Sequence, residues 1–295
     1  MGSMATSSPV QNAGSRPAAL PAEPEFAWTD KDFARIQALI YRHAGIHLHD
    51  GKRAMVYSRL SRRLRQTGYR RFGDYLDGLE ACEAGDGESE IEHFVNALTT
   101  NLTSFFREPH HFAILAELLK TRRGGEPWNL WCSAASTGEE AYSMAITAAE
   151  ALGSDGGGFR LVASDIDSRV LAKAVAGVYR AEQVKDLSAE RLRRFFLRGK
   201  AGNQGMVRVK PELQRLVEFR QINLVSENWP FSQAFDVVFC RNVMIYFDTA
   251  TQRKVLEHMH RMLRPGGLLM AGHAENFSEA RDLFKLQGKT VYVRL

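Results

Sequence analysis

The feature that most restricts the fold is a change of pattern after residue 112, where short apolar segments begin to alternate with helical patterns. Strands that alternate with helices usually pair in parallel, because each helix carries the chain back across the sheet. The last two apolar segments, 283–286 and 290–294, flank a glycine and predict a closing antiparallel hairpin. The sequence therefore predicts an α/β fold with a Rossmann-like sheet, and we expect its core strands at residues 129–132, 159–164, 235–240 and 268–271.

The segment before this change carries only helical patterns. Phe33, Ile36 and Ile40 share one helical face, and Gly45 is a typical helix end. A second helix with apolar residues at every fourth position runs up to Gly68. Two shorter amphipathic patterns follow at residues 72–79 and 91–98. These patterns predict a separate, all-helical N-terminal domain.

Two further segments depart from both patterns. Residues 1–27 are rich in proline, serine and alanine and poor in large apolar side chains, so we expect a disordered tail. Residues 178–218 form a long insertion between the second and third core strands, with a glycine-rich stretch at 199–205 and an alternating pattern at 206–209. The insertion predicts a small antiparallel β-subdomain, in the form of an accessory hairpin on the crossover.

The second predicted helix is strongly basic. Residues 51–73 hold eight lysines and arginines and no acidic residue, and the whole chain carries a net charge of +5. A surface of one sign is typical of docking to an acidic partner, either nucleic acid, an anionic membrane or an acidic protein, although an ordinary solvated face is the alternative. No apolar run approaches the roughly 18 residues of a membrane span, so we expect no membrane insertion. The candidate docking residues are Arg53, Arg59, Arg62 and Arg63.

Candidate ligand-binding groups follow the ends of the predicted strands, where doubly wound sheets bind their ligands. The loop at residues 133–138 consists of small residues before a helix, so a ligand can approach its backbone N–H groups. Asp165 ends the second strand, where nucleotide-binding folds place a carboxylate for ribose hydroxyls. The alternative is that Asp165 or Asp167 caps the next helix. The third strand is followed by Arg241, Asn242 and Tyr246, and residues 263–268 then break the next helix before a strand. Together, the order of these groups is closer to methyltransferases than to dehydrogenases.

Four longer segments closely resemble the CheR family of chemotaxis receptor protein-glutamate O-methyltransferases. They are residues 96–108, 135–140, 163–167 and 240–247, and the likeness extends from about Thr29 to the C-terminus. The resemblance implies a helical domain at 28–95, a linker at 96–110 that contributes to the active site, and a methyltransferase domain at 111–295 with its β-subdomain at about 178–218. Ala141 departs from the proline common in the family; alanine is a good helix former, so we expect little consequence.

The resemblance also implies S-adenosylmethionine as cofactor and S-adenosylhomocysteine as product. Arg107 and Tyr246 would face the reacting groups, although they could instead form a packing pair. The substrate would be glutamate side chains of chemoreceptors, whose cytoplasmic helical region would dock on the basic helix. A C-terminal receptor tether peptide would bind the β-subdomain, unless the subdomain only stabilises the crossover. The implied cofactor contacts are Asn101, Thr103, Arg107, Glu140, Asp165, Asn223, Leu224, Arg241 and Asn242.

Two other functions remain open at this stage. A basic helical domain suits an RNA methyltransferase, but between Lys52 and Arg71 only Tyr57 and Tyr69 could stack on bases. A non-catalytic S-adenosylmethionine sensor or scaffold would keep the same binding residues. We favour the protein methyltransferase, because the motif contexts of Arg107, Arg241, Asn242 and Tyr246 are retained. A glutamate carboxylate is ionised at pH 7 and needs no general base, so the absence of a Ser/His/Asp arrangement is expected.

Cysteines and histidines give no metal-binding pattern. The three cysteines lack ligand spacing, which argues against a disulfide framework and a zinc site. His43, His47, His49 and the adjacent His110 and His111 are expected in surface or packing roles. We therefore expect no metal ion. The protein is further expected to be a monomer in the cytoplasm that is recruited to membrane-bound receptors and has no nucleic-acid partner.

Overall fold

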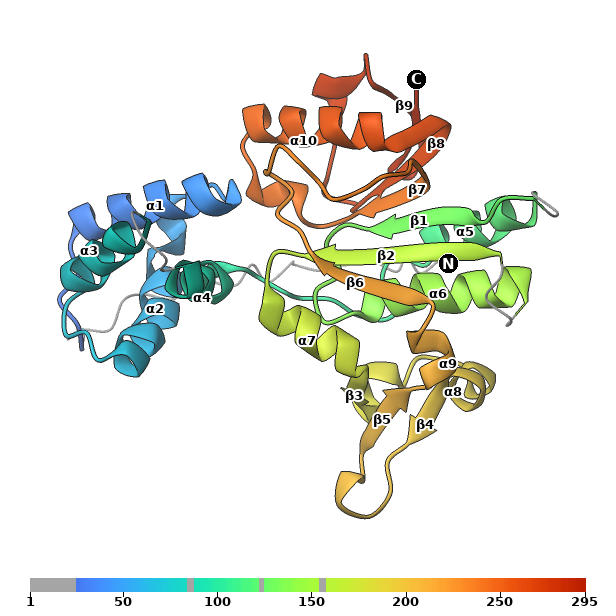
Figure 1. Cartoon of the computed structure of the whole chain (residues 1–295), viewed down its shortest axis with the longest axis horizontal. Helices are drawn as coiled ribbons and strands as arrows, with labels where there is room; N and C mark the ends of the chain where they lie inside the picture. The colour runs from blue at the N-terminus through green and yellow to red at the C-terminus, as the bar shows by residue number, and fades with distance from the viewer. Residues whose placement is uncertain (1–24, 84–87, 122–124, 154–157) are drawn as a thin grey trace, which may run out of the picture.

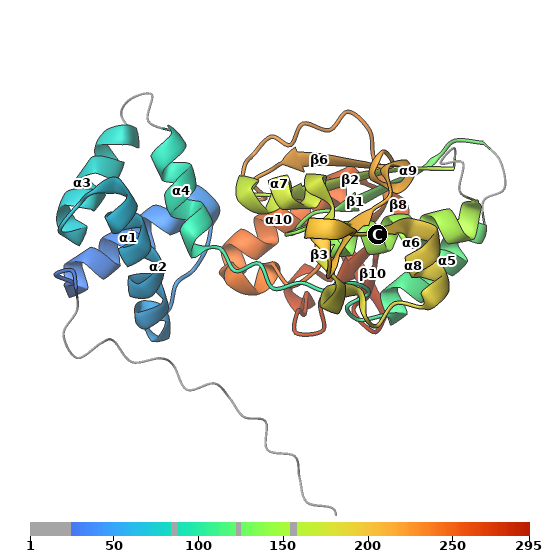
Figure 2. The same cartoon turned by 90° about the horizontal axis from the view of Figure 1, so that it is seen from below.

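The computed structural model describes residues 25–83, 88–121, 125–153 and 158–295, so nearly all of the expected tail at 1–27 lies outside the described residues. A group of helices stands beside a larger α/β domain, and a small β-subdomain projects from the latter (Figure 1). The linker runs from the last helix of the first group to the α/β domain (Figure 2). No helix in these ranges is long and apolar enough to cross a membrane.

The expected N-terminal helices are confirmed. In α1, the Thr29 hydroxyl accepts a hydrogen bond from the Asp32 N–H and the Asp32 carboxylate accepts one from the Thr29 N–H, which closes a capping box. The helix ends at Gly45, whose φ of 66° is readily adopted by glycine. Ile36, Leu60 and other apolar residues from all four helices form one buried core. The helices are α1 Asp30–Ala44, α2 Arg53–Thr67, α3 Phe72–Glu83 and α4 Glu88–Leu98.

The main sheet has the strand order β6-β2-β1-β7-β8-β10-β9. Its first five strands are parallel, and β10 pairs antiparallel with both β8 and β9. The Rossmann-like α/β class and the closing hairpin are therefore confirmed, although β8 begins earlier than expected. The strands are β1 Trp128–Cys132, β2 Phe159–Asp165, β6 Val217–Gln221, β7 Phe235–Cys240, β8 Leu263–Ala271, β9 Phe284–Gly288 and β10 Val291–Arg294.

Helices cover both faces of this sheet. Side chains alternate along a strand, so Leu130 faces the core formed with α5 (His110–Lys120) and α6 (Glu139–Leu152). Trp131 faces the opposite core, which is formed with α10 (Thr249–Met262). The remaining helix of the sheet, α7 (Ser168–Ala176), follows β2 and contacts β2 and β6.

The insertion differs from the expected hairpin in two ways. Its last residues belong to β6, a parallel strand that pairs with β2 at the edge of the main sheet. The alternation of apolar and charged residues in β6 is typical of a half-exposed strand, so the sequence pattern alone did not separate it from the insertion. The antiparallel β-subdomain itself is confirmed, but it has three strands, in the order β3-β5-β4. They are β3 Val178–Arg180, β4 Phe196–Arg198 and β5 Met206–Val209, accompanied by η2 Ala181–Val184, α8 Ala189–Phe195 and α9 Pro211–Gln214.

Candidate active site

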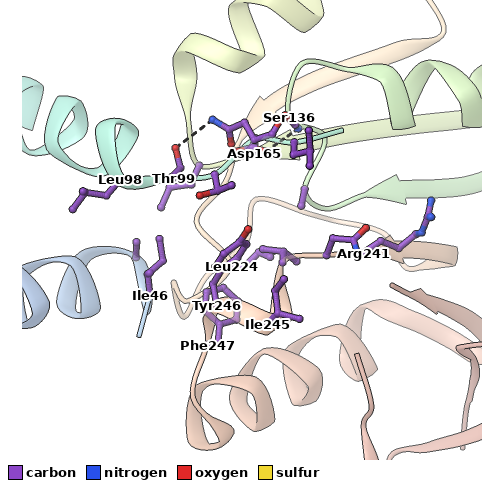
Figure 3. Close-up of a pocket in the computed structure, with 18 of the residues that line it drawn as sticks. Ile46, Leu98, Thr99, Ser136, Asp165, Leu224, Arg241, Ile245, Tyr246 and Phe247 are labelled. Atoms are coloured by element: carbon purple, nitrogen blue, oxygen red, sulfur yellow. Dashed lines mark hydrogen bonds between the residues drawn. The ribbon is translucent and has the colours of Figure 1, made fainter. Parts of the chain in front are cut away.

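A cavity of about 350 Å³ lies where the carboxyl ends of the parallel strands meet the linker and the helical domain. Asp165 and Ser136 lie on one side of it and Tyr246 and Leu224 on the other, with Ile46 from the helical domain nearby (Figure 3). All ten residues that the resemblance assigned to cofactor or catalysis line this cavity: Asn101, Thr103, Arg107, Glu140, Asp165, Asn223, Leu224, Arg241, Asn242 and Tyr246. Sequence reasoning missed the wall from the helical domain, which includes His47, His49, Lys52 and Met55.

Asp165 and Asp167 have different roles. One oxygen of Asp165 accepts a hydrogen bond from the Ser136 N–H at 2.8 Å, and the other accepts one from the Asp167 N–H at 3.0 Å. Burial raises the pKa of the Asp165 carboxyl. Each Asp165 oxygen can accept a further hydrogen bond, such as one from a ribose hydroxyl. Asp167 caps α7 by accepting a hydrogen bond from the Arg169 N–H, so the capping role belongs to Asp167, and ribose binding by Asp165 stays a prediction.

Asp167 also fixes the linker, which the sequence did not predict. Its Oδ2 accepts hydrogen bonds from Thr99 Oγ1 at 2.9 Å and from Asn101 Nδ2 at 3.0 Å. The carbonyl of Asn101 accepts a further bond from Ser136 Oγ at 2.9 Å. The Asn101 amide, implied as a cofactor contact, thus also holds the linker against the end of β2.

Arg241 is the centre of a buried charge cluster. Its guanidinium lies 2.8 Å from a Glu140 oxygen and 3.3 Å from a Glu108 oxygen, and it donates a hydrogen bond to the Arg107 carbonyl at 2.5 Å. The Arg241 side chain has no exposed surface. Burial raises the pKa of Glu140, and the charge of Arg241 opposes that rise. Arg241 therefore joins the linker, α6 and the loop after β7.

Glu275 is a structural residue of the site that sequence reasoning did not single out. Its carboxylate accepts hydrogen bonds from the N–H groups of Asn242, Val243 and Met244 at 3.0, 2.9 and 2.8 Å, and from that of Gly272 at 2.5 Å. Asn242 has a φ of 59°, which is uncommon for a residue other than glycine. The four bonds hold the backbone that leads to the catalytic candidate Tyr246, and nothing in the local pattern around Glu275 indicated them.

The helical domain docks directly on this loop. The Tyr246 carbonyl accepts a hydrogen bond from the His47 N–H at 2.8 Å, and Ile46 and Phe247 form an antiparallel bridge. Asn223 Nδ2 donates to the His43 carbonyl at 2.6 Å, so this implied cofactor residue also links the domains. These contacts hold Tyr246 between the two domains.

The other catalytic candidate, Arg107, lies in the linker. Its guanidinium donates a hydrogen bond to the Leu102 carbonyl at 3.2 Å. No hydrogen bond joins the side chains of Arg107 and Tyr246 within the described residues, although both line the cavity. Each side chain therefore keeps polar capacity for a ligand.

The basic face of α2 is less positive than its own sequence suggests. Arg53 lies 2.7 Å from Asp30, and Arg63 forms an ion pair with Glu90, so acidic residues of α1 and α4 partly neutralise them. Arg59 donates to the carbonyls of residues 98 and 99, at 3.0 and 2.6 Å. Of the four candidate docking residues, only Arg62 is exposed and without an ion pair in the described ranges. The docking role stays a prediction.

A second cluster contains Glu108, His110 and His111, whose ligand atoms lie within 4.8 Å of one another. The sequence analysis overlooked Glu108 as a partner of these histidines. The Nε2 atoms of both histidines lie 3.1 Å from the carbonyl of Lys289, and Arg241 lies 3.3 Å from Glu108. A divalent cation here would face the guanidinium, so we assign the cluster to hydrogen bonding between the linker and the C-terminal hairpin.

His111 predicts an acid-dependent loss of stability. Burial, together with the charge of Arg241, lowers the pKa of His111 to about 4, whereas unfolded histidine titrates near 6.5. Its contribution to stability is therefore complete above pH 6.5 and is lost as the pH falls towards 4. The free energy of unfolding, measured with urea, should fall between pH 7 and pH 5. This fall should be about 2 kcal/mol smaller in His111→Gln than in the unmodified chain.

The matched control for this experiment is His110→Gln, at a more exposed position that contacts the same carbonyl. Its free energy of unfolding should fall between pH 7 and pH 5 by the same amount as that of the unmodified chain. Equal losses in the unmodified chain and in His111→Gln would contradict the assignment of a neutral, buried imidazole.

Comparisons with known proteins identify the family and agree with the two-domain fold. The family model of the CheR methyltransferase SAM-binding domain matches residues 101–293, and that of the CheR methyltransferase all-alpha domain matches residues 31–99. A chemotaxis protein methyltransferase of Klebsiella aerogenes is 52% identical over 264 residues, which cover 90% of this chain and 89% of that protein. The chemotaxis protein methyltransferase of Escherichia coli is 50% identical over 266 residues, 90% of this chain and 91% of that protein. With two matching domains and relatives of this identity along nearly its whole length, the chain belongs to the CheR family of S-adenosylmethionine-dependent chemotaxis methyltransferases.

Proposed function

We propose that this chain transfers a methyl group from S-adenosylmethionine to glutamate carboxylates of chemoreceptors. The products are glutamate 5-O-methyl esters and S-adenosylhomocysteine. The observation that carries the proposal is a single cavity lined by acidic residues suited to the cofactor, Asp165 and Glu140, and by Arg107 and Tyr246, which can orient a carboxylate. The resemblance of the linker and of the loop after β7 to the family motifs supports the same assignment.

The reaction needs alignment more than acid–base chemistry. A carboxylate oxygen attacks the methyl carbon, the carbon–sulfur bond breaks, and its electron pair stays on sulfur. The negative charge of the carboxylate and the positive charge of the sulfonium both disappear, and no proton moves. An ionised glutamate is already the nucleophile at pH 7. The protein accelerates the step by holding oxygen, carbon and sulfur in line and by excluding water.

Separate residues serve the two ligands in this mechanism. Asp165 accepts hydrogen bonds from the ribose hydroxyls, and the small residues at 133–138 let the cofactor approach the backbone. Arg107 forms a charge-assisted hydrogen bond to the incoming carboxylate, and the Tyr246 hydroxyl orients one of its oxygens. The linker and the loop after β7 thus bring together groups for one methyl transfer.

Receptor binding uses two surfaces in this proposal. The exposed Arg62 and the neighbouring arginines of α2 dock on the acidic, cytoplasmic helical region of the receptor. A receptor tether peptide adds as a strand to the β-subdomain, whose outer strands β3 and β4 each pair on one side only within the described residues. The enzyme would thereby be recruited from the cytoplasm to membrane-bound receptors.

The test of the function is transfer of radiolabelled methyl groups from S-adenosylmethionine to receptor-containing membranes, to total RNA, or to neither. We expect label on the receptor that mild alkali releases as methanol, because carboxyl esters are labile to base. Label on RNA would favour an RNA methyltransferase instead. Cofactor binding without transfer to either would indicate a sensor or scaffold.

Substitutions of Arg107 and Tyr246 test their roles. Arg107→Ala and Tyr246→Phe should each lower kcat about 10- to 100-fold, because each removes a hydrogen bond to a charged group. Tyr246→Phe should leave the affinity for S-adenosylhomocysteine within about threefold, because the hydroxyl acts on the glutamate. Initial rates with receptor membranes and calorimetric titration measure the two effects. Unchanged turnover in both variants would mean that the two side chains only pack.

A further inference from the structure

The β-subdomain makes direct contacts with the loop that lines the cofactor side of the cavity. In β3, the Tyr179 hydroxyl donates a hydrogen bond to the Thr137 carbonyl at 2.7 Å. In η2, Gln183 Nε2 donates to one oxygen of Glu139 at 3.0 Å, and Thr137 Oγ1 donates to the other oxygen at 2.6 Å. The next residue on either side, Ser136 and Glu140, lines the cavity. Two hydrogen bonds from the insertion therefore fix the segment between two cavity residues.

The packing at this point is close and buried. Tyr179 is 3% exposed and Glu139 is 2% exposed. Gly138 has a φ of 98°, and a Cβ atom there would lie 2.8 Å from the Tyr179 hydroxyl and 2.9 Å from Cβ of Ala174. The loop can approach the subdomain this closely only because residue 138 is glycine.

The same tyrosine also contacts the linker. Its ring packs edge-on against Phe105 at 5.0 Å between centroids, and Phe105 packs against Phe196 of β4 at 5.6 Å. The linker and the 136–140 loop are joined by the bond between Ser136 and Asn101. The β-subdomain thus supports two of the segments that form the cavity.

We propose that Tyr179 and Gln183 are positioning residues for S-adenosylmethionine, so that the β-subdomain holds the 136–140 loop in its cofactor-binding geometry. The inference rests on the proposed binding of the cofactor in this cavity, and does not depend on the identity of the methyl acceptor. Neither residue lines the cavity, so both act through Thr137 and Glu139. A ligand that binds and shifts the β-subdomain would therefore change the affinity for the cofactor. By thermodynamic linkage, the cofactor would change the affinity for that ligand by the same factor.

The experiment is calorimetric titration of the full chain with S-adenosylhomocysteine, in the absence of receptor. Tyr179→Phe and Gln183→Met should each raise Kd about three- to tenfold, the range expected for loss of one positioning hydrogen bond. Gln183 is exposed, so its substitution leaves the core intact, although it also removes the bond that Gln183 Oε1 accepts from the Arg180 N–H at 3.0 Å. The double variant should raise Kd by less than the product of the single effects, because both bonds fix one loop. With saturating cofactor, kcat for receptor methylation should stay within about twofold.

The matched control is Tyr142→Phe. The Tyr142 hydroxyl also donates to a buried carbonyl at 2.7 Å, but that carbonyl belongs to Ala174 of α7. Its loss should change Kd less than about twofold. An equal rise of Kd in Tyr142→Phe, or a rise below twofold in both Tyr179→Phe and Gln183→Met, would overturn the inference. If the unmodified chain bound no S-adenosylhomocysteine, the proposed function and the inference would both fail. If it bound S-adenosylhomocysteine normally but did not methylate the receptor, only the proposed function would be overturned.

Discussion

Arg241→Met should lower the free energy of unfolding by about 3–5 kcal/mol, the usual cost of removing one partner from a buried ion pair. The methionine leaves the buried Glu140 and the partly buried Glu108 without their shared cation. It also frees the Arg107 carbonyl, so the linker loses its bond to the loop after β7. Cofactor binding should fall below detection, because three segments of the cavity lose their common contact. Urea unfolding and calorimetric titration measure the two losses.

The control for Arg241 is Arg253→Met. Arg253 also pairs with two carboxylates, Asp282 at 2.6 Å and Glu257 at 2.7 Å, but at the surface. Its loss should lower the free energy of unfolding far less than the loss of Arg241, because exposed ion pairs contribute little to stability. A second variant, Glu140→Gln with Arg241→Met, should recover part of the stability because one buried charge is removed. Similar losses for Arg241→Met and Arg253→Met would contradict the description of a buried cluster.

Gly45→Ala should lower kcat/KM for receptor methylation at least tenfold by displacing the helical domain. A Cβ atom on Gly45 would lie 2.4 Å from Val225 Cγ1 and 3.1 Å from Thr251 Cγ2, both in the α/β domain. Valine is β-branched and stiff, so its methyl group cannot move away cheaply. The displacement pulls residues 46 and 47 away from Tyr246 and Phe247, and the cavity loses one wall. We expect a lower kcat/KM and faster proteolysis of the linker.

Gly68→Ala is the control, because it places alanine in the same left-handed backbone region and so creates similar backbone strain. Gly68 also ends a helix of the N-terminal domain in the left-handed region, with φ of 82° against 66° for Gly45, but its Cβ position meets nothing within 4 Å. Gly68→Ala should cost about 1 kcal/mol of stability and leave kcat/KM unchanged. If both variants changed catalysis equally, the effect would come from backbone strain and not from the domain interface.

Local patterns predicted the elements that bury a continuous apolar face. The four N-terminal helices and the strands β1, β2 and β7 have such faces, and their ends follow from residues such as Gly45 and Gly68. The edge strand β6 and the three-residue β3 were missed because an exposed or very short strand has little pattern of its own. The charge of α2 was overestimated for a related reason: Asp30 and Glu90, which pair with its arginines, lie on other helices.

The residues of the candidate site also fall into two groups, those that a local sequence pattern predicted and those that it did not. Asp165 was predicted from its place at a strand end, while residues such as Arg107 and Asn223 were assigned only through the family resemblance. Glu275 and Tyr179 were missed because their partners are backbone groups distant in the sequence. A hydrogen bond to a distant N–H or carbonyl requires no particular neighbouring residue, so no motif records it. The same holds for the bridge between Ile46 and Phe247.

The place of β10 in the sheet has a consequence for the order in which the chain folds during synthesis. Residues 291–294 are made after the other strands that the structure describes in the main sheet, yet they pair with β8 on one side and with β9 on the other. Tyr292 is 4% exposed, and its hydroxyl accepts a hydrogen bond from the Phe277 N–H. A nascent chain that stops before residue 291 has an unpaired edge on β8, which is a template for association with other chains. The helical domain can fold on the ribosome, whereas the C-terminal half of the sheet closes only after translation of these residues.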